Sequence, residues 1–313
     1  MARPEGSVNR PSVAASGDLI VLNPRSAGAE GDGVRRILAE TLPHAELRVQ
    51  QPGEDVAAVV SAAVAAGRRR VIAAGGDGTV SGVAQGLLHT EPALGVVPLG
   101  TGNLFARELG LPLDPRQAAE LLAAGGSTRT VDVMRVNGLV SLTHIGLGLY
   151  AVFIREPEPE LKRRLGAAAY LGGLRDGLDA LRRGRSWKLK ITVDGVKRRT
   201  RVSLVVAANA GCTPVPGLRF GEAIEVGDGR LDLCLYRGRT VGDAFRAVGR
   251  LLALRAPFPA KLEYWSAVRE IRIESRRPLA VQTDLPLGPT RSLHIENLPG
   301  ALRVITPSPG GRA

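Results

Sequence analysis

The N-terminal part of the chain alternates short apolar runs with longer stretches of helical periodicity. Apolar runs rich in β-branched residues occupy residues 19–23, 71–74 and 93–98, and a more polar run occupies 45–51. The stretches between them repeat apolar residues at helical spacing. In the Ala-rich stretch 55–67, an aspartate stands near the start and a glycine at the end, as in a capped helix. This alternation predicts a doubly wound parallel sheet with helices on both faces.

Three Gly-rich turns, near 24–33, 75–78 and 100–102, follow strands of this predicted sheet. Ligands of such sheets bind beyond the carboxyl ends of the strands, where all three turns would meet. Glycine lets backbone N–H groups approach an anion, and a following helix N-terminus adds its dipole. The turns therefore predict a phosphate-binding site. An ordinary strand–helix turn remains the alternative for any single one of them, and the sequence GGDGT matches neither a Walker A loop nor GxGxxG.

After about residue 130 the pattern changes to period-two alternation with hairpin turns such as Asp194-Gly195 and Asp228-Gly229. A helical segment with cationic clusters interrupts it at 161–184. We expect a tail over 1–16, an α/β domain over 17–133, a mainly antiparallel β domain over 134–307 and a tail over 308–313. The last strands of the β domain could return to the first domain, and a cleft would separate the two.

Composition changes the picture mainly through charge. The 313 residues are 44% hydrophobic, enough for a sizeable core, and carry a net charge of +12. Such a surface favours anionic partners, and the low aromatic content of 4% argues against nucleic acid, which favours stacking side chains. Basic clusters at 162–164, 182–185 and 197–201 could contact an anionic membrane surface or could simply be solvated. Cys212 and Cys234 lack metal-ligand spacing and are expected to be reduced thiols.

The chain contains no run of about 18 apolar residues and begins without the apolar core of a signal peptide. We therefore expect a cytoplasmic protein whose contact with the inner membrane surface, if any, is peripheral. The sequence leaves the oligomeric state open, a homodimer included.

Three motifs together resemble the diacylglycerol kinase catalytic domain family, and more narrowly the bacterial soluble lipid kinases related to diacylglycerol and sphingosine kinases. They read VLNPRSAG, AAGGDGTV and VPLGTGNLFARELGLP, in the family's order. The later stretches LKRRLGAAAY, AANAG, EVGDGRLDL and LHIENLPGALRVITP extend the resemblance over residues 18–307. It implies an α/β domain like that of NAD kinases and phosphofructokinases, followed by an antiparallel β-sandwich, with the active site in the cleft between them.

The resemblance also implies an activity: transfer of the γ-phosphate of ATP to a lipid hydroxyl, with Mg²⁺. Two aspartates, Asp77 and Asp284, would be catalytic. The second-domain metal site would use Asp228, the backbone carbonyl of Arg230, and Glu225. The implied ATP-binding residues are Asn23, Gln50, Gly75, Gly76, Asp77, Gly78, Thr79, Gly100, Thr101 and Asn103.

One departure from the family pattern concerns the acceptor end of the reaction. The family has Asp-Gly-Glu, with the glutamate as base, where this chain has QTDLPLGP. Asp284 matches the aspartate, but the glutamate position falls on Leu285 or Pro286, neither of which can take a proton. Ser81-Gly82 also replaces the usual Asn-Glu after GGDGT-x. Asp284 could serve as the base, turnover could be slow, or the protein could bind ATP and lipid without catalysis.

A second alternative is an NAD-kinase-like enzyme, but the Asn-x-Gly-x-Leu-Gly-Phe stretch and the Asn-Glu pair of that family are missing. The lipid itself stays open: diacylglycerol, a sphingoid base, phosphatidylglycerol and an isoprenoid alcohol all fit the pattern.

Overall fold

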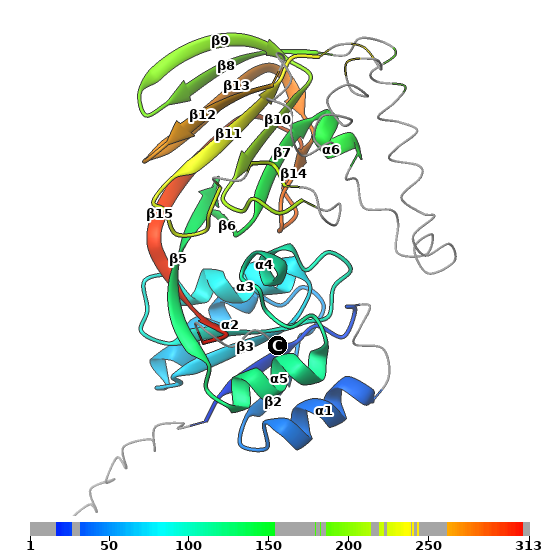
Figure 1. The fold of residues 1–313 in the computed structure, drawn as a ribbon, viewed down its shortest axis with the longest axis vertical. Helices are drawn as coiled ribbons and strands as arrows, with labels where there is room; N and C mark the ends of the chain where they lie inside the picture. The colour runs from blue at the N-terminus through cyan, green and yellow to red at the C-terminus, as the bar shows by residue number, and fades with distance from the viewer. Residues whose placement is uncertain are drawn as a thin grey trace, which may run out of the picture.

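A computed structural model describes residues 17–26, 32–153, 179, 182, 186–213, 219–221, 224–238, 240, 243 and 262–308. An α/β part and a β part are stacked along the long axis of the molecule (Figure 1). The helix expected over 161–184 and the two tails fall wholly or mostly outside these residues. No helix in the described ranges combines the length and apolar character needed to cross a bilayer.

The α/β part is a parallel sheet in the order β2-β1-β3-β4 with helices on both faces. The expected cap of the second helix is present, because Asp55 accepts a hydrogen bond from the Ala58 N–H at 3.1 Å. The doubly wound fold expected from the sequence is confirmed. Its strands are Leu19–Leu22 (β1), Glu46–Val49 (β2), Arg70–Gly75 (β3) and Ala93–Pro98 (β4), and its helices are Gly33–Thr41 (α1), Val56–Ala65 (α2), Asp77–Leu87 (α3), Leu104–Glu108 (α4) and Pro115–Ala123 (α5).

Alternate residues of β1, β3 and β4 pack in two separate hydrophobic cores, whereas β2, at the edge of the sheet, is mostly exposed. In β1, Leu19 and Val21 pack with α2 and α3, whereas Ile20 and Leu22 pack with α1 and α5. Strands covered on both faces have no polar face, which explains why their sequences read as continuous apolar runs.

The β part is a sandwich of two sheets around a core of its own. One sheet is antiparallel, in the order β12-β11-β10-β7-β14, and the other continues from the parallel sheet through β15-β13-β8-β9. This confirms the antiparallel β-sandwich that the sequence predicts after the α/β domain. The elements are Ser127–Val136 (β5), Leu139–Ser141 (β6), His144–Gly148 (β7), Leu149–Phe153 (α6), Trp187–Val193 (β8), Val196–Val202 (β9), Leu204–Ala208 (β10), Leu231–Tyr236 (β11), Leu262–Ala267 (β12), Glu270–Leu279 (β13), Val281–Gln282 (β14) and Thr290–Thr306 (β15).

The long strand β15 belongs to both parts of the molecule. Its first half pairs with β13, and its second half reaches β4, where Val304 lies opposite Leu94 in a parallel pair. Strand β5 accompanies it antiparallel along most of its length, as Figure 1 shows. The two parts are therefore joined by continuous hydrogen-bonded strands.

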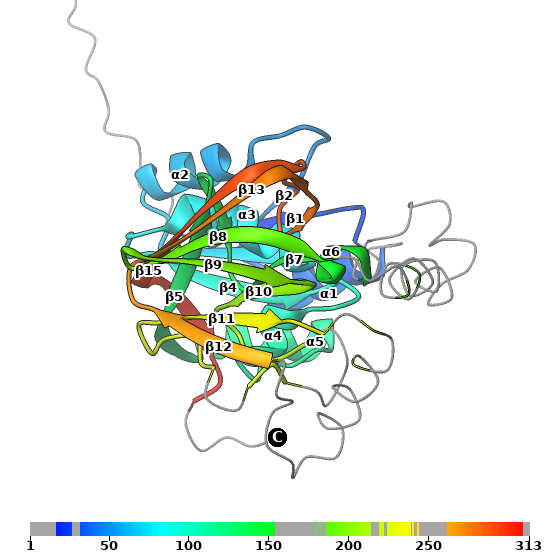
Figure 2. The same cartoon turned by 90° about the horizontal axis from the view of Figure 1, so that it is seen from above.

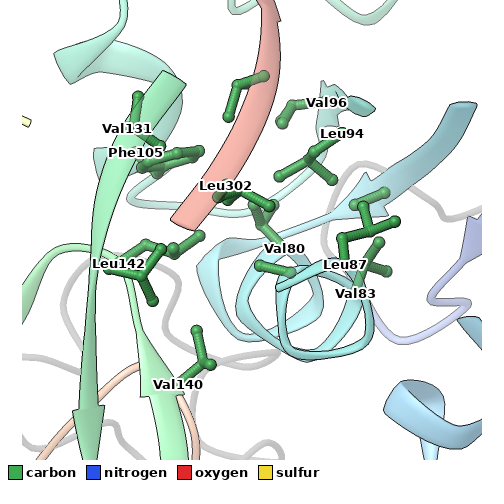
Figure 3. Close-up of a cluster of buried hydrophobic side chains, with 14 of the residues drawn as sticks. Val80, Val83, Leu87, Leu94, Val96, Phe105, Val131, Val140, Leu142 and Leu302 are labelled. Carbon is green, nitrogen blue, oxygen red and sulfur yellow. The ribbon is translucent and has the colours of Figure 1, made fainter. Parts of the chain in front are cut away.

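Leu302 of β15 lies in the core that α3, α4 and the parallel sheet share. It is 1% exposed and sits among Val80, Leu94, Phe105 and Val131 (Figure 3).

We expect Leu302→Ala to lower the free energy of unfolding by about 2–5 kcal/mol, because the lost side chain leaves a cavity that a packed core cannot fill. Urea unfolding of both proteins measures the difference. Leu47→Ala is the matched control; Leu47 is 38% exposed, and surface changes usually stay within about 0.5 kcal/mol. Equal effects of the two substitutions would contradict the role assigned to Leu302.

Candidate active site

The glycine turns after β3 and β4 pack against each other backbone to backbone. A Cβ atom on Gly100 would lie 2.6 Å from the Cα of Gly76, and one on Gly75 would lie 2.4 Å from the Thr79 Oγ1. Real Cβ atoms do not approach so closely, so these positions admit only glycine. The Leu99 N–H donates to the Gly75 carbonyl at 2.9 Å and ties the two turns together.

Asn103 closes the turn after β4. Its backbone is left-handed, with φ 48°, a conformation that asparagine tolerates better than most residues. Its side-chain oxygen accepts from the Gly100 N–H at 2.9 Å, and its amide donates to the Gly100 carbonyl at 2.8 Å. The two bonds fix the shape of the loop and leave Thr101 exposed at its tip.

Asn23 joins the turn after β1 to the turn after β3. It follows β1, and its side-chain amide donates to the Thr79 Oγ1 at 3.0 Å while its oxygen accepts from the Arg25 N–H at 3.0 Å. Gln50 follows the neighbouring strand β2. Its side-chain oxygen is buried without a hydrogen-bond partner in the described part of the chain, so it is free to accept from a ligand.

The residues that the sequence predicts for ATP binding therefore meet at one edge of the sheet. They come from the carboxyl ends of all four strands, β1 to β4, and from the first turn of α3. Helix α3 begins at Asp77, so its positive end points into the same region.

Asp77 lies at the meeting point of α3 and α4. Its Oδ1 accepts from the Phe105 N–H at 3.1 Å, which places the carboxylate at the N-terminus of α4. Burial, reinforced by the negative charge of Asp284, raises the pKa of Asp77 to about 6, and the backbone donors of α4 oppose the rise.

Asp284, after β14, connects the two parts of the molecule. Its carboxylate accepts five hydrogen bonds, one of them from the Ser81 hydroxyl of α3 at 3.0 Å. The others come from the β6–β7 connection: the Ser141 hydroxyl at 3.1 Å, the Leu142 N–H at 2.6 Å, the Thr143 N–H at 3.3 Å and the Thr143 hydroxyl at 2.8 Å. The backbone presses equally close, since a Cβ on Gly78 would lie 2.9 Å from the Asp284 carbonyl oxygen.

The five bonds are distributed unevenly over the two carboxylate oxygens. Oδ2 accepts four of them, whereas Oδ1 accepts only the Thr143 hydroxyl. Four donors crowd Oδ2, which has about two lone-pair sites, whereas Oδ1 has one donor among the described residues and so retains a site for a further donor.

The loop that resembles the family's metal site is held elsewhere. The Asp228 carboxylate accepts from the Arg230 N–H at 2.9 Å, and Glu225 and Asp228 are exposed. The Gly229 N–H donates to Asp132 in β5, and the Gly229 carbonyl accepts from Asn297 in β15. The described contacts thus attach this loop to β5 and β15, not to the glycine turns.

The two carboxylates at the glycine turns suit Mg²⁺ that is bound to a nucleotide. Kinase Mg²⁺ is usually held by one or two carboxylates together with phosphate oxygens and water. Asp77 and Asp284 repel each other closely enough to affect the pKa of Asp77, and a cation would offset that repulsion. The pair therefore fits an Mg²⁺–nucleotide. Within the described ranges, no three His, Cys, Asp or Glu side chains gather into a metal cluster.

Sequence reasoning missed two features of this region. Asp132 is 3% exposed, and its two oxygens accept from the Gly229 and Gly300 N–H groups at 2.6 and 2.7 Å. A lone carboxylate in the apolar strand TVDVM was the available signal. Ser81, noted only as a departure from the family pattern, donates to Asp284 across the two parts.

We expect Asp284→Asn to lower the pKa of Asp77 from about 6 towards the ordinary value of 3.8, because the substitution removes a neighbouring negative charge. Carboxyl ¹³C NMR titration of Asp77 measures it. A raised pKa also means that Asp77 favours folding below pH 3.8 and that this contribution disappears as pH rises through 6. Glu40→Gln, at the C-terminal end of α1 on the opposite edge of the sheet, should leave the pKa of Asp77 unchanged. An unaltered pKa in Asp284→Asn would contradict the coupling.

Comparisons with known proteins identify the family. The family model described as "Diacylglycerol kinase catalytic domain" matches residues 18–136. A protein of Chromohalobacter salexigens named "Probable lipid kinase YegS-like" is 30% identical over 297 residues, which is 92% of each chain. A Pseudomonas aeruginosa protein of the same name is 38% identical over 157 residues, 49% of this chain and 51% of the relative.

The likeness extends to solved structures. A crystal structure of a diacylglycerol kinase from Bacillus anthracis superposes with a TM-score of 0.71 at 25% identity, covering 93% of this chain and 97% of that one. The chain spans about half the length of the first curated relatives it matches, 54% and 51%, but nearly all of the Chromohalobacter protein. The chain belongs to the diacylglycerol kinase catalytic domain family of lipid kinases.

Proposed function

We propose that the protein transfers the γ-phosphate of ATP, with Mg²⁺, to the hydroxyl of a lipid such as diacylglycerol. The observation that carries the proposal is the convergence of two domains on one place. Asp284 of the β part is bonded to Ser81 of α3, so an acceptor-side carboxylate stands beside the glycine turns that suit a triphosphate. Phosphoryl transfer requires mainly such positioning and neutralisation of charge.

At the nucleotide end, the turns supply backbone N–H groups and the positive end of α3. The free side-chain oxygen of Gln50 would accept from the nucleoside, and Asn23 would keep the first turn in register with Thr79. Asp77 would hold the Mg²⁺ that accompanies ATP, and the cation would offset the repulsion between Asp77 and Asp284. Mg²⁺ would neutralise charge that develops on the phosphate oxygens. Asp228, Glu225 and the Arg230 carbonyl would at most form a separate site on the β part.

At the acceptor end, the Oδ1 atom of Asp284 has an unused lone pair. A lipid hydroxyl donating to it would be oriented for attack and could pass its proton there as the new P–O bond forms. The enzyme would act in the cytoplasm at the inner membrane surface, where ATP and the lipid meet.

A catalytically impaired ATP- and lipid-binding protein is the second candidate. The observation that favours it is the sequence after Asp284, where half-buried Leu285 and exposed Pro286 replace the family's glutamate. An NAD-kinase-like activity has no such observation in its favour.

Incubation of purified protein with labelled ATP, Mg²⁺ and a total lipid extract tests the first candidate. We expect a labelled lipid, and a turnover about 10²–10⁴-fold lower in Asp284→Asn, because the proton acceptor is lost. Asp77→Ala should also lose activity, whereas Glu40→Ala, at the C-terminal end of α1 on the opposite edge of the sheet, should retain it. A fall in kcat at unchanged KM, with the ATP-induced thermal shift preserved, separates lost chemistry from a loosened domain contact. Full activity of Asp284→Asn would refute its role.

Pro286→Glu separates the two candidates. If Asp284 already accepts the proton, the added carboxylate should change turnover by less than about tenfold. If the chain is impaired only by the missing base, turnover should rise by about 10²–10⁴-fold. Pro286→Gln, which adds the same volume without a base, is the matched control. ATP binding measured by thermal shift should be the same in all three proteins.

A further inference from the structure

We propose that the outer face of the hairpin β8–β9, together with the adjoining β12–β13 turn, docks on an anionic phospholipid bilayer. This surface lies outside the candidate active site and suits a kinase whose acceptor is a membrane lipid. The proposal does not depend on the proposed activity, because vesicle binding is measured without ATP.

The register of the hairpin gathers basic side chains on one face. Lys188 pairs with Arg201, Lys190 with Arg199, and Thr192 with Lys197. Residues directly opposite in an antiparallel pair share a face, and the alternate residues Leu189 and Ile191 are buried in the sandwich core on the other face. The outward set, called the basic face below, is Lys188, Lys190, Lys197, Arg199 and Arg201.

The basic face is mostly uncompensated. Lys190 forms an ion pair with Glu274 at 2.5 Å, and the other four members form none with any described residue. Further along the same sheet, Arg272 pairs with Glu270 and Arg135 with Glu296, whereas Arg276, Arg277 and Arg291 form no ion pair with a described residue. Unpaired positive charge is therefore greatest on β8–β9 and continues onto parts of β13 and β15.

Like charges stand directly opposite each other in two of these cross-strand pairs, Lys188–Arg201 and Lys190–Arg199. Such pairs are destabilising in a free hairpin. The attraction of each cation to an external anionic surface would offset that repulsion. Protection of an exposed edge strand could explain charges on β9 alone, but it does not explain the lysines on β8.

An apolar corner lies at the tip of the hairpin. Asp194, in the β8–β9 turn, accepts from the Val268, Arg269 and Glu270 N–H groups at 2.8, 2.9 and 2.9 Å, so the β12–β13 turn is fixed beside the hairpin. Val196 and Val268, at 58% and 54%, are the two most exposed large hydrophobic residues of the described chain. Val196 pairs with Val193, on the opposite face of the hairpin from the basic face, so the two valines would extend the contact around the hairpin tip. Exposed apolar side chains near cations are typical of peripheral membrane contacts.

The surroundings of the hairpin favour lipid over nucleic acid. Nucleic-acid-binding faces usually combine cations with exposed stacking aromatics. Trp187 points to the inner face of the hairpin, and Trp265 is covered by the guanidinium of Arg198 at 4.8 Å from the ring centre. Figure 1 places β8 and β9 at the end of the molecule remote from α1 and α2, and Figure 2, seen from above, shows them in front of the α/β part.

Co-sedimentation of the full chain with vesicles tests the proposal. Vesicles of phosphatidylcholine are compared with vesicles that also contain phosphatidylglycerol, at about 0.1 M and about 1 M salt. We expect binding to the anionic vesicles only, and loss of binding at high salt. A basic residue near such a surface contributes about fivefold, so the triple variant Lys197→Ala, Arg199→Ala, Arg201→Ala should bind about 100-fold more weakly.

The triple variant Arg35→Ala, Arg36→Ala, Arg69→Ala is the matched control, because it removes the same charge from exposed positions of the α/β part. It should bind as the wild type does. Val196→Ser with Val268→Ser should weaken binding to anionic vesicles with less dependence on salt. If the alanine variant fails to fold, glutamine at the same three positions removes the charge with less change in shape.

Three results would overturn the proposal. They are equal binding to neutral and anionic vesicles, equal losses in the two charge variants, and failure of the wild type to sediment with vesicles. Binding of poly(U) that depends on the basic face, without vesicle binding, would assign the surface to nucleic acid instead.

Discussion

The carboxylate of Asp284 is the contact on which the arrangement of the site depends. It gathers a hydroxyl from α3 and four donors from the β6–β7 connection, so the α/β part and the β part meet at one anion. Hydrogen bonds to a charged group are worth more than neutral ones, and a donor left without its acceptor in a partly buried place costs free energy. The loop after β14 and the start of α3 are therefore held in a fixed relation.

The continuous strand β15 also holds the α/β part and the β part in place relative to each other. Leu293 and Ile295 pack in the sandwich core, whereas Leu302 and Val304 pack in the core beneath α3. A single strand thus contributes to both hydrophobic cores. Strand β5 pairs with it antiparallel along both halves, with one register shift between Leu298 and Leu302. Rotation of one part against the other would have to break these pairs, so the glycine turns and Asp284 keep their separation.

Charges of one sign are crowded together at two places in the molecule: negative charge at one and positive charge at the other. Asp77 and Asp284 bring two negative charges together between the domains. Burial and the charge of Asp284 both raise the pKa of Asp77. On the outer sheet, the basic face crowds positive charge on neighbouring strands. Local conflicts of this kind are common at functional sites, where a ligand of the opposite charge relieves them. Mg²⁺ with ATP and an anionic bilayer are the ligands proposed for the two places.

The sequence by itself determined what depends on local spacing. Apolar runs and helical periodicity predicted the doubly wound sheet, and Asp55 predicted the start of α2. The motifs around Gly76 and Gly100 indicated the family and the edge of the sheet where the turns meet. Only the tertiary structure decided the contact of Ser81 with Asp284, 203 residues apart, the burial of Asp132, and the paired outward lysines and arginines of β8 and β9. Such contacts depend on which strands pair and in which register, and packing of the whole chain, not local pattern, sets both.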